Sequence, residues 1–107
     1  MRFFGLKTCD TCRKALKTLA DREVNVIDVR ADGVSDADRA AIVAAFGEAA
    51  VNTRSTTWRG LSEDERGQST EALLAAHPTL MKRPVIEHNG QWYQGWTPAT
   101  RAALGVD

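Results

Sequence analysis

The chain has 107 residues, 43% of them hydrophobic and 26% charged, with 14 basic residues balancing 14 acidic ones. This composition is typical of a globular domain with a hydrophobic core. The even charge argues against a protein that binds nucleic acid directly, since such proteins usually carry a basic excess. No apolar run is long enough for a membrane span, the start is too short for a signal peptide, and no heptad repeat is present, so we expect a cytoplasmic monomer without membrane contact.

The first thirty residues predict a strand, a helix and a second strand. Residues 1–5 include Phe3 and Phe4 and predict a short strand. Apolar residues at i, i+3, i+4 and i+7 begin at Cys12 and predict a helix with one buried stripe. The β-branched residues of 23–29 predict another strand. Strands joined through a helix lie parallel, so this order predicts a βαβ unit.

The middle of the chain predicts helices. Ser35 is a typical N-cap, and it precedes an apolar pattern of helical spacing that Gly47 ends. Residues 70–76 predict another helix. We therefore expect a helical insertion over about 35–77 between the two halves of a single domain, 1–107.

The last quarter of the chain predicts a β-hairpin and a short helix. Residues 85–88 and 91–93 flank Asn89-Gly90, a strong signal for a two-residue hairpin turn. Thr97 and Pro98 are typical of an N-cap and a first helical position. The full order, βαβ, helical insertion and ββα, predicts an α/β protein with a thioredoxin-like fold.

The two cysteines stand where the first strand turns into the first helix. A helix N-terminus stabilises a thiolate, so Cys9 is the candidate catalytic nucleophile. We expect the cations of Arg13 and Lys14 to lower its pKa and to attract an anionic substrate. A CxxC motif beside a βαβ unit indicates redox chemistry. Cys12 is therefore a candidate resolving or redox partner, and a buried core cysteine is an equal alternative.

Two arginines, Arg83 and Arg54, are candidate site residues on weaker sequence evidence than the cysteines. Arg83 precedes Pro84 just before the hairpin, where a thioredoxin-like fold favours a cis peptide bond facing the active cysteine, although a trans turn proline is the alternative. Arg54 lies in a polar loop, where a lone arginine is usually a solvated charge, yet its planar fork suits an oxyanion or a carboxylate. The cysteines and histidines lack paired metal-ligand spacing, so no metal site is predicted.

These motifs resemble those of the ArsC/Spx family of thioredoxin-like proteins over nearly the whole chain. They are most similar to its YffB-type subgroup of glutathione-dependent thiol reductases. The stretches that carry the resemblance are the opening motif Cys9–Leu16, the loop Asn52–Arg59 and the Arg-Pro motif Lys82–Ile86.

The resemblance implies an arsenate-reductase-like oxidoreductase with no bound cofactor. In such an enzyme the Cys9 thiolate attacks a small oxyanion or a disulfide, and glutathione or a glutaredoxin-type thiol donor resolves the adduct. The residues it implies in substrate or thiol binding are Thr11, Arg13, Lys14, Arg54, Arg83 and Pro84.

The resemblance also has a departure and an alternative. Arsenate reductases of this family carry a third arginine near the turn into the last helix, and the stretch Gln94–Pro98 has none. Arsenate would then lack one charge-assisted partner, which puts true arsenate reduction in doubt. The alternative is an Spx-like transcriptional regulator that binds RNA polymerase and is switched by a Cys9–Cys12 disulfide.

Overall fold

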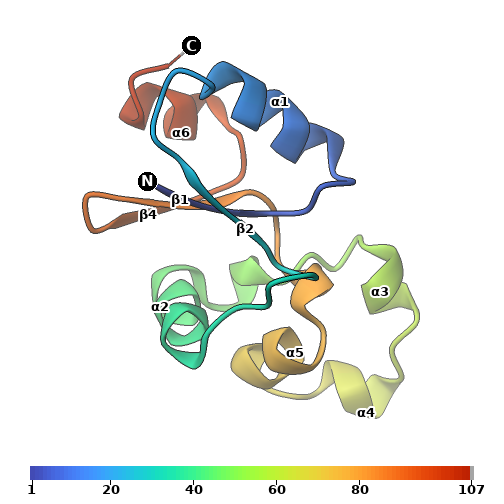
Figure 1. Ribbon diagram of the computed structural model, residues 1–107. Coiled ribbons are helices and arrows are strands. Elements are labelled where there is room, and N and C mark those ends of the chain that lie inside the picture. The colour runs from blue at the N-terminus through green and yellow to red at the C-terminus, as the bar shows by residue number, and fades with distance from the viewer. Residues whose placement is uncertain (107) are drawn as a thin grey trace. The chain divides into compact units, whose positions relative to one another are not determined.

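The structure, a computed structural model, describes residues 1–106. Its elements in chain order are β1 (Arg2–Gly5), α1 (Asp10–Thr18), β2 (Asn25–Asp28), α2 (Asp36–Phe46), η1 (Gly47–Ala50), α3 (Thr56–Arg59), α4 (Glu63–Arg66), α5 (Thr70–Ala76), η2 (Pro78–Leu80), β3 (Val85–His88), β4 (Gln91–Gln94) and α6 (Pro98–Ala103). The chain forms two compact units, one of residues 1–32 with the chain from 83 onward and one of residues 33–82 (Figure 1). None of the described helices is long and apolar enough to cross a membrane.

The first unit is built on a four-stranded mixed sheet in the order β2-β1-β3-β4. β1 pairs in parallel with β2 and antiparallel with β3, as the βαβ and ββα order predicts. The hairpin between β3 and β4 turns at Asn89 and Gly90, whose φ angles of 53° and 79° are those a two-residue hairpin requires. The predicted strand, helix and hairpin order of this half is confirmed.

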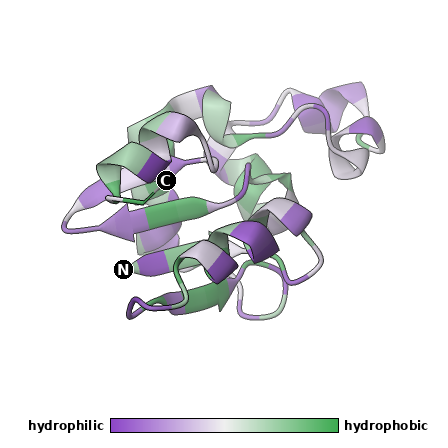
Figure 2. Ribbon diagram, turned by 90° about the horizontal axis from the view of Figure 1, so that it is seen from above, coloured by the Kyte–Doolittle hydropathy of each residue, from purple (hydrophilic) through white to green (hydrophobic). Residues whose placement is uncertain are grey.

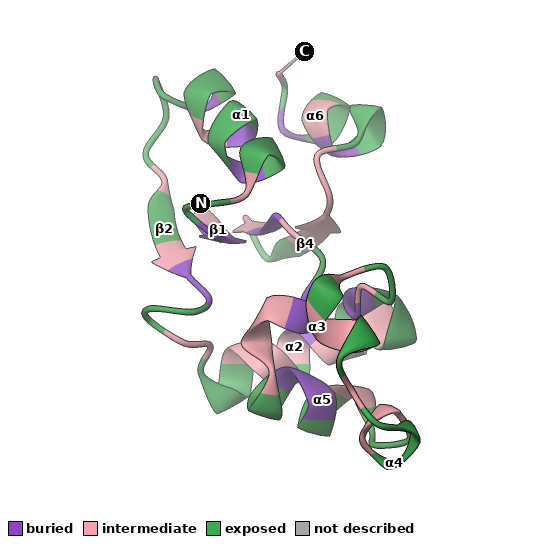
Figure 3. Ribbon diagram, turned by 90° about the vertical axis from the view of Figure 1, so that its right-hand side faces the viewer, coloured by how far each residue is buried: buried purple, intermediate pink, exposed green. Residues whose placement is uncertain are grey.

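The core of the first unit lies on one face of the sheet, where both α1 and α6 pack (Figures 1 and 3). Phe3 of β1 and Ile86 of β3 are register partners and are fully buried. They form one cluster with Cys12 and Ala15 of α1 and with the C-cap residues of α1 and α6, Leu19 and Leu104. The apolar strand segments stand out in Figure 2. This packing holds the N-terminal turn of α1, and with it the cysteines, against β1.

The second unit spans 33–82 and holds α2 to α5, and the helical insertion predicted at about 35–77 lies within it. The Ser35 side chain accepts a hydrogen bond from the Asp38 N–H, and Gly47 ends α2 with φ of 58°, as predicted. An isolated bridge between Val51 and Met81 closes the unit.

The loop expected at 52–59 is in part helical. Ser55 caps the single turn α3, accepting a hydrogen bond from the Trp58 N–H. One turn of helix is too short for hydrophobic periodicity to reveal, so the sequence pattern did not predict it.

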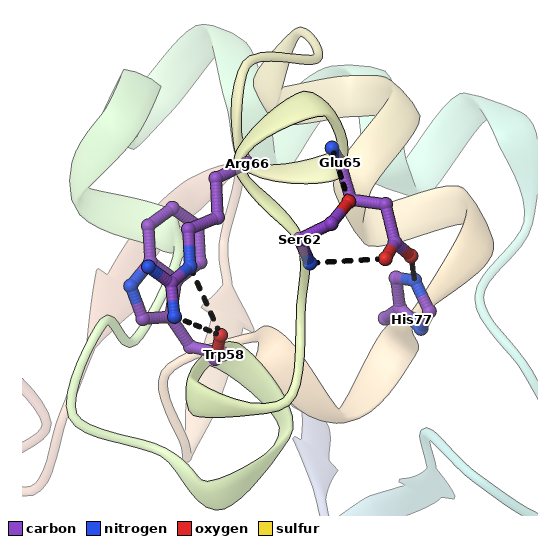
Figure 4. A network of polar contacts seen from close by, with 5 residues as sticks. All are labelled: Trp58, Ser62, Glu65, Arg66 and His77. Carbon is purple, nitrogen blue, oxygen red and sulfur yellow. Dashed lines mark hydrogen bonds and ion pairs between the residues drawn. The ribbon is translucent and has the colours of Figure 1, made fainter.

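A network of polar contacts joins α3, α4 and the end of α5 (Figure 4). The Arg66 guanidinium lies 5.4 Å from the Trp58 ring centroid and donates two hydrogen bonds to the Trp58 carbonyl. Ser62 and Glu65 form a capping box at the start of α4, and the Glu65 carboxylate lies 3.7 Å from His77 Nε2. These contacts stabilise two helices that are each only one turn long.

Candidate active site

Cys9 stands at the N-cap of α1, as predicted. Its backbone is extended, with φ of −86° and ψ of 118°, and its carbonyl accepts a hydrogen bond from the Arg13 N–H at 3.0 Å. Its own N–H donates to the Leu6 carbonyl at 3.0 Å, which fixes the turn between β1 and α1. The side chain is half-buried. The sulfur therefore lies at the N-terminal turn of α1 and stays open to a reactant.

The surroundings of Cys9 favour its thiolate. Burial raises the pKa of the Cys9 thiol, but this effect is outweighed by hydrogen bonds from the Cys12 backbone N–H, from the Cys12 thiol and from the Arg83 guanidinium, and by the charge of Arg83. The net pKa of Cys9 is lowered from its ordinary value. A larger fraction of Cys9 is consequently nucleophilic near neutral pH.

Arg83 reaches Cys9 from the segment that enters β3. The Arg83–Pro84 peptide bond is cis, which confirms the predicted isomer. Pro84 is fully buried, and its carbonyl accepts a hydrogen bond from the Gly95 N–H at 2.8 Å. The segment before the hairpin thus holds Arg83 beside Cys9, with the cis Pro84 next in the chain.

Cys12 is buried under Cys9, with 1% of its surface exposed, and both cysteines are free thiols. Burial first, and then the neighbouring Cys9, raise the pKa of the Cys12 thiol to about 11, against the lowering effects of a hydrogen bond from the Leu6 backbone and of the Arg83 charge. Cys12 therefore stays protonated at neutral pH and donates to the Cys9 thiolate. The sequence left open whether Cys12 is a core cysteine or a partner of Cys9. In the structure Cys12 lies in the core and also contacts the Cys9 sulfur.

Gly5 makes room for Cys12. A Cβ on Gly5 would lie 2.9 Å from the Cys12 Sγ and 2.8 Å from a ring carbon of Phe3, closer than side chains tolerate. Sequence reasoning missed this role of Gly5. The available signal was a glycine at the end of a strand directly before the CxxC turn, which often marks a close approach of another group.

The other cations of the first helix act differently from the expectation. Arg13 and Lys14 are exposed, and the Arg13 guanidinium pairs with the Asp10 carboxylate. The groups that lower the pKa of Cys9 are Cys12 and Arg83, so the expected lowering by Arg13 and Lys14 is corrected. A pair with Asp10, exposed to water on both sides, leaves little of the Arg13 charge to act on the thiol. Thr11 is exposed in the same helical turn.

Arg54 belongs to the second unit. It is exposed, in the turn before α3, and its backbone N–H donates to the Asn52 side-chain oxygen at 3.0 Å. The structure brings together Cys9, Cys12 and the Arg83-Pro84 pair, whereas a role of Arg54 beside them stays a prediction. Among residues 1–106, no group of three or more His, Cys, Asp or Glu side chains is placed to hold a metal ion.

A cysteine at the start of the first helix, a cis-proline directly before β3 and a β2-β1-β3-β4 sheet define a thioredoxin-like protein. The model of the ArsC family matches residues 4–104. The chain therefore belongs to the ArsC family.

Three relatives agree with this membership. An uncharacterized protein from Haemophilus influenzae is 43% identical over 95 residues, which are 82% of this chain and 83% of that protein. The structure of a YffB protein is 31% identical with a TM-score of 0.85, covering 95% of this chain and 96% of its own. The structure of an arsenate reductase (ArsC) related protein from Brucella melitensis is 30% identical with a TM-score of 0.72, covering 95% and 91%. The expected likeness to YffB-type proteins of the ArsC family is confirmed.

Proposed function

We propose that this protein is a thiol oxidoreductase that reduces mixed disulfides of small thiols, with glutathione as the reductant. Cys9 is the nucleophile, and no bound cofactor takes part. The protein works in a reducing compartment such as the cytoplasm, where glutathione is abundant and Cys9 is kept as a free thiol.

One observation carries this proposal: the Cys9 sulfur receives hydrogen bonds from Cys12 and from the Arg83 guanidinium, and its pKa is lowered. Thiol–disulfide exchange starts from a thiolate, and its rate is highest when the pKa of the attacking thiol is near the ambient pH. A half-buried thiolate at a helix N-terminus beside an arginine has both the charge state and the access for this reaction.

The proposed reaction has two exchange steps. The Cys9 thiolate attacks the glutathione sulfur of a mixed disulfide, forming a Cys9–glutathione disulfide and releasing the other sulfur as a thiolate. A second glutathione thiolate then attacks the glutathione sulfur bound to Cys9, which releases oxidised glutathione and restores the Cys9 thiolate. One external glutathione thiolate is consumed: it takes up the glutathione half of the mixed disulfide as oxidised glutathione, and the other half of the substrate leaves as a thiolate.

Cys12 donates a hydrogen bond in this scheme and does not attack the adduct. A thiol with a pKa of about 11 is almost wholly protonated near neutral pH and is therefore a slow nucleophile. An external thiol must resolve the Cys9 adduct.

Anion binding is assigned to arginines. Arg83 already lies beside Cys9 and can pair with a carboxylate of glutathione or with an oxyanion. The family resemblance supports a similar role for Arg54. It also supports substrate contacts of Thr11, Arg13 and Lys14, which lie on the exposed first turn of α1. Arsenate remains a poorer candidate substrate, because Gln94–Pro98 supplies no further arginine.

The test is an assay of disulfide reduction coupled to glutathione reductase and NADPH. The substrate is the mixed disulfide of glutathione and 2-mercaptoethanol, and arsenate is assayed in parallel. We expect the wild type to turn over the disulfide well above background and arsenate slowly or not at all. Cys9→Ser should fall to the uncatalysed rate, since the nucleophile is gone.

Cys12→Ser is the matched variant, because serine keeps a hydrogen-bond donor at the same position. It should retain most of the turnover. If Cys12→Ser abolished turnover, resolution would run through a Cys9–Cys12 disulfide and the external-thiol step would be wrong. If the wild type had no reductase activity but bound the α-subunit of RNA polymerase, the regulator alternative would replace the enzyme.

A further inference from the structure

A cavity of about 290 Å³ lies between α1 and the β1–β2 side of the sheet in the first unit. Its walls are mainly apolar and include Gly5, Leu6, Cys12, Leu16 and Val26. Its volume is close to the lower end of small-molecule sites, which span roughly 300–1,000 Å³. Cys9 itself does not line it.

The edge strand explains why the cavity is open. β2 is an edge strand of the sheet, and its first residues are exposed (Figure 3). Val26 is 47% exposed, which is unusual for a large apolar side chain that faces a cavity. The end of α6 packs on the same face through Leu104, in the cluster that contains Ile86 of β3.

The charged residues that line the cavity differ in the hydrogen bonds and ion pairs that they form. The Asp28 carboxylate accepts hydrogen bonds from the N–H groups of Arg30 and Ala31 at 2.9 Å each, and the Asp32 carboxylate accepts one from the Asp28 N–H at 2.9 Å. Arg13 pairs with Asp10 on the outside of the helix.

Lys7 differs from the other charged residues that line the cavity. Its ammonium is near enough to Asp28 to lower the pKa of that carboxyl, after the larger effect of the Ala31 N–H, yet within residues 1–106 it forms no ion pair. It is therefore an exposed positive charge at the mouth of an apolar cavity, available to a ligand.

We propose that this cavity is a binding site for a small molecule with an apolar body and a single anionic group, such as an aryl-substituted or branched-chain carboxylate. The apolar body lies against Leu16 and Val26, and the carboxylate pairs with the Lys7 ammonium. The bound molecule contacts the wall formed by Cys12, whose thiol donates to Cys9. The site is independent of the reductase activity proposed above, because binding requires no turnover.

The test is a titration of the full-length ¹⁵N-labelled protein with 3-phenylpropionate, followed by two-dimensional NMR. We expect the amide signals of Leu6, Lys7 and Val26 to shift together, with a dissociation constant on the order of 1 mM for a ligand of this size. Signals of β4 should stay in place. The absence of saturable shifts around the cavity would overturn the proposal.

Lys7→Gln tests the anion pairing, and Lys17→Gln, exposed in the last turn of α1, is the charge-matched control. Lys7→Gln should bind 3-phenylpropionate about fivefold more weakly than the wild type, the effect of one exposed ion pair. Lys17→Gln should bind it as the wild type does. The neutral analogue 3-phenylpropan-1-ol should bind Lys7→Gln and wild type equally. Equal binding of the acid to all three proteins, or tighter binding of 3-phenylpropylamine than of the acid, would contradict the assignment.

Val26→Gln tests the apolar wall, and its half-exposed position on the edge strand should tolerate the change. The substitution should weaken the binding of 3-phenylpropionate and of 3-phenylpropan-1-ol to the same extent. The rate of Cys9 alkylation by iodoacetamide in saturating 3-phenylpropionate is the readout for contact with Cys12. An unchanged rate would show that the bound molecule does not reach that wall.

Discussion

At the scale of single residues, the reactivity of this protein depends on how many donors face one sulfur. Cys9 receives hydrogen bonds from two groups of Cys12 and from Arg83, which together overcome the effect of its burial. Hydrogen bonds from charged donors are the strong ones, so the guanidinium is the contact most open to a test by substitution.

Arg83→Gln should raise the pKa of Cys9 toward the value of an ordinary thiol, because it removes a positive charge and a charged donor from the thiolate. The hydrogen bonds from Cys12 remain, so part of the lowering should persist. The measurement is the pH dependence of Cys9 alkylation by iodoacetamide, read by peptide mass.

Arg83→Lys should fall between wild type and Arg83→Gln, since it keeps the charge and loses the planar fork. Arg30→Gln removes an exposed guanidinium elsewhere in the first unit and is the control. An alkylation profile of Arg83→Gln that matched the control would mean that Arg83 does not act on the thiol.

At the scale of elements, the turn from β1 into α1 joins the sheet to the reactive cysteine. β1 is the only strand of the described sheet with parallel and antiparallel neighbours, and Phe3 at its centre is fully buried. Gly5 ends the strand at the point where the Cys12 sulfur packs against the backbone. β1, Gly5 and α1 thus pack directly against one another next to the reactive cysteine.

Gly5→Ala should destabilise the protein by about 1–3 kcal/mol, the usual cost of overpacking a core. The added Cβ would lie 2.8 Å from Phe3 and 2.9 Å from the Cys12 Sγ, so one of them must move. Displacing Cys12 should also raise the pKa of Cys9. Urea unfolding and the alkylation profile measure the two effects.

Gly60→Ala is the matched control in the second unit. Its nearest atoms to a new Cβ are 3.6 Å away or more and its φ is −81°, so its free energy of unfolding should change by no more than about 0.5 kcal/mol. Equal stabilities of the two variants would show that the space at Gly5 is not limiting.

At the scale of the whole molecule, buried and hydrogen-bonded titratable groups determine how stability depends on pH. Hydrogen bonds lower the pKa of Asp28, first of all from the Ala31 N–H, of Glu65 from Ser62 and of Glu87 from the Arg2 side chain. Burial has the opposite consequence for Cys12, whose pKa is raised to about 11.

Stability should therefore fall at both ends of the pH range. The carboxylates stabilise the fold above their unfolded pKa values near 4, and this contribution is lost as the pH falls through their lowered folded values. Between about pH 9 and 11 the unfolded chain loses the Cys12 proton while the folded chain keeps it, so stability falls as the pH rises. Urea unfolding at a series of pH values, under reducing conditions, measures both limbs.

Asp28→Asn should flatten the acid limb, and Cys12→Ala should flatten the alkaline limb. An alkaline limb unchanged in Cys12→Ala would assign that loss of stability to another group.

Local backbone chemistry was sufficient to predict several elements of this protein. The hairpin at Asn89-Gly90 and the cap at Ser35 follow from the conformations that a few adjacent residues prefer. The position of Cys9 at a helix N-cap follows in the same way, since an apolar stripe begins three residues later. One-turn helices such as α3 depend on a single cap and on contacts like that of Arg66, so periodicity does not reveal them.

The candidate site also has features that local sequence determines and features that depend on the tertiary structure. The sequence by itself determined that a cysteine stands at the start of a helix with an Arg-Pro motif later in the chain. Only the tertiary structure placed Arg83, rather than Arg13 or Lys14, beside the thiol, because β3 must pair with β1 before that arginine can reach Cys9. It also decided that Cys12 is a protonated donor, since its burial against Gly5 depends on how closely α1 packs on the sheet. Residue order determines local conformation, whereas the pKa of a thiol depends on which distant groups the fold brings into contact with it.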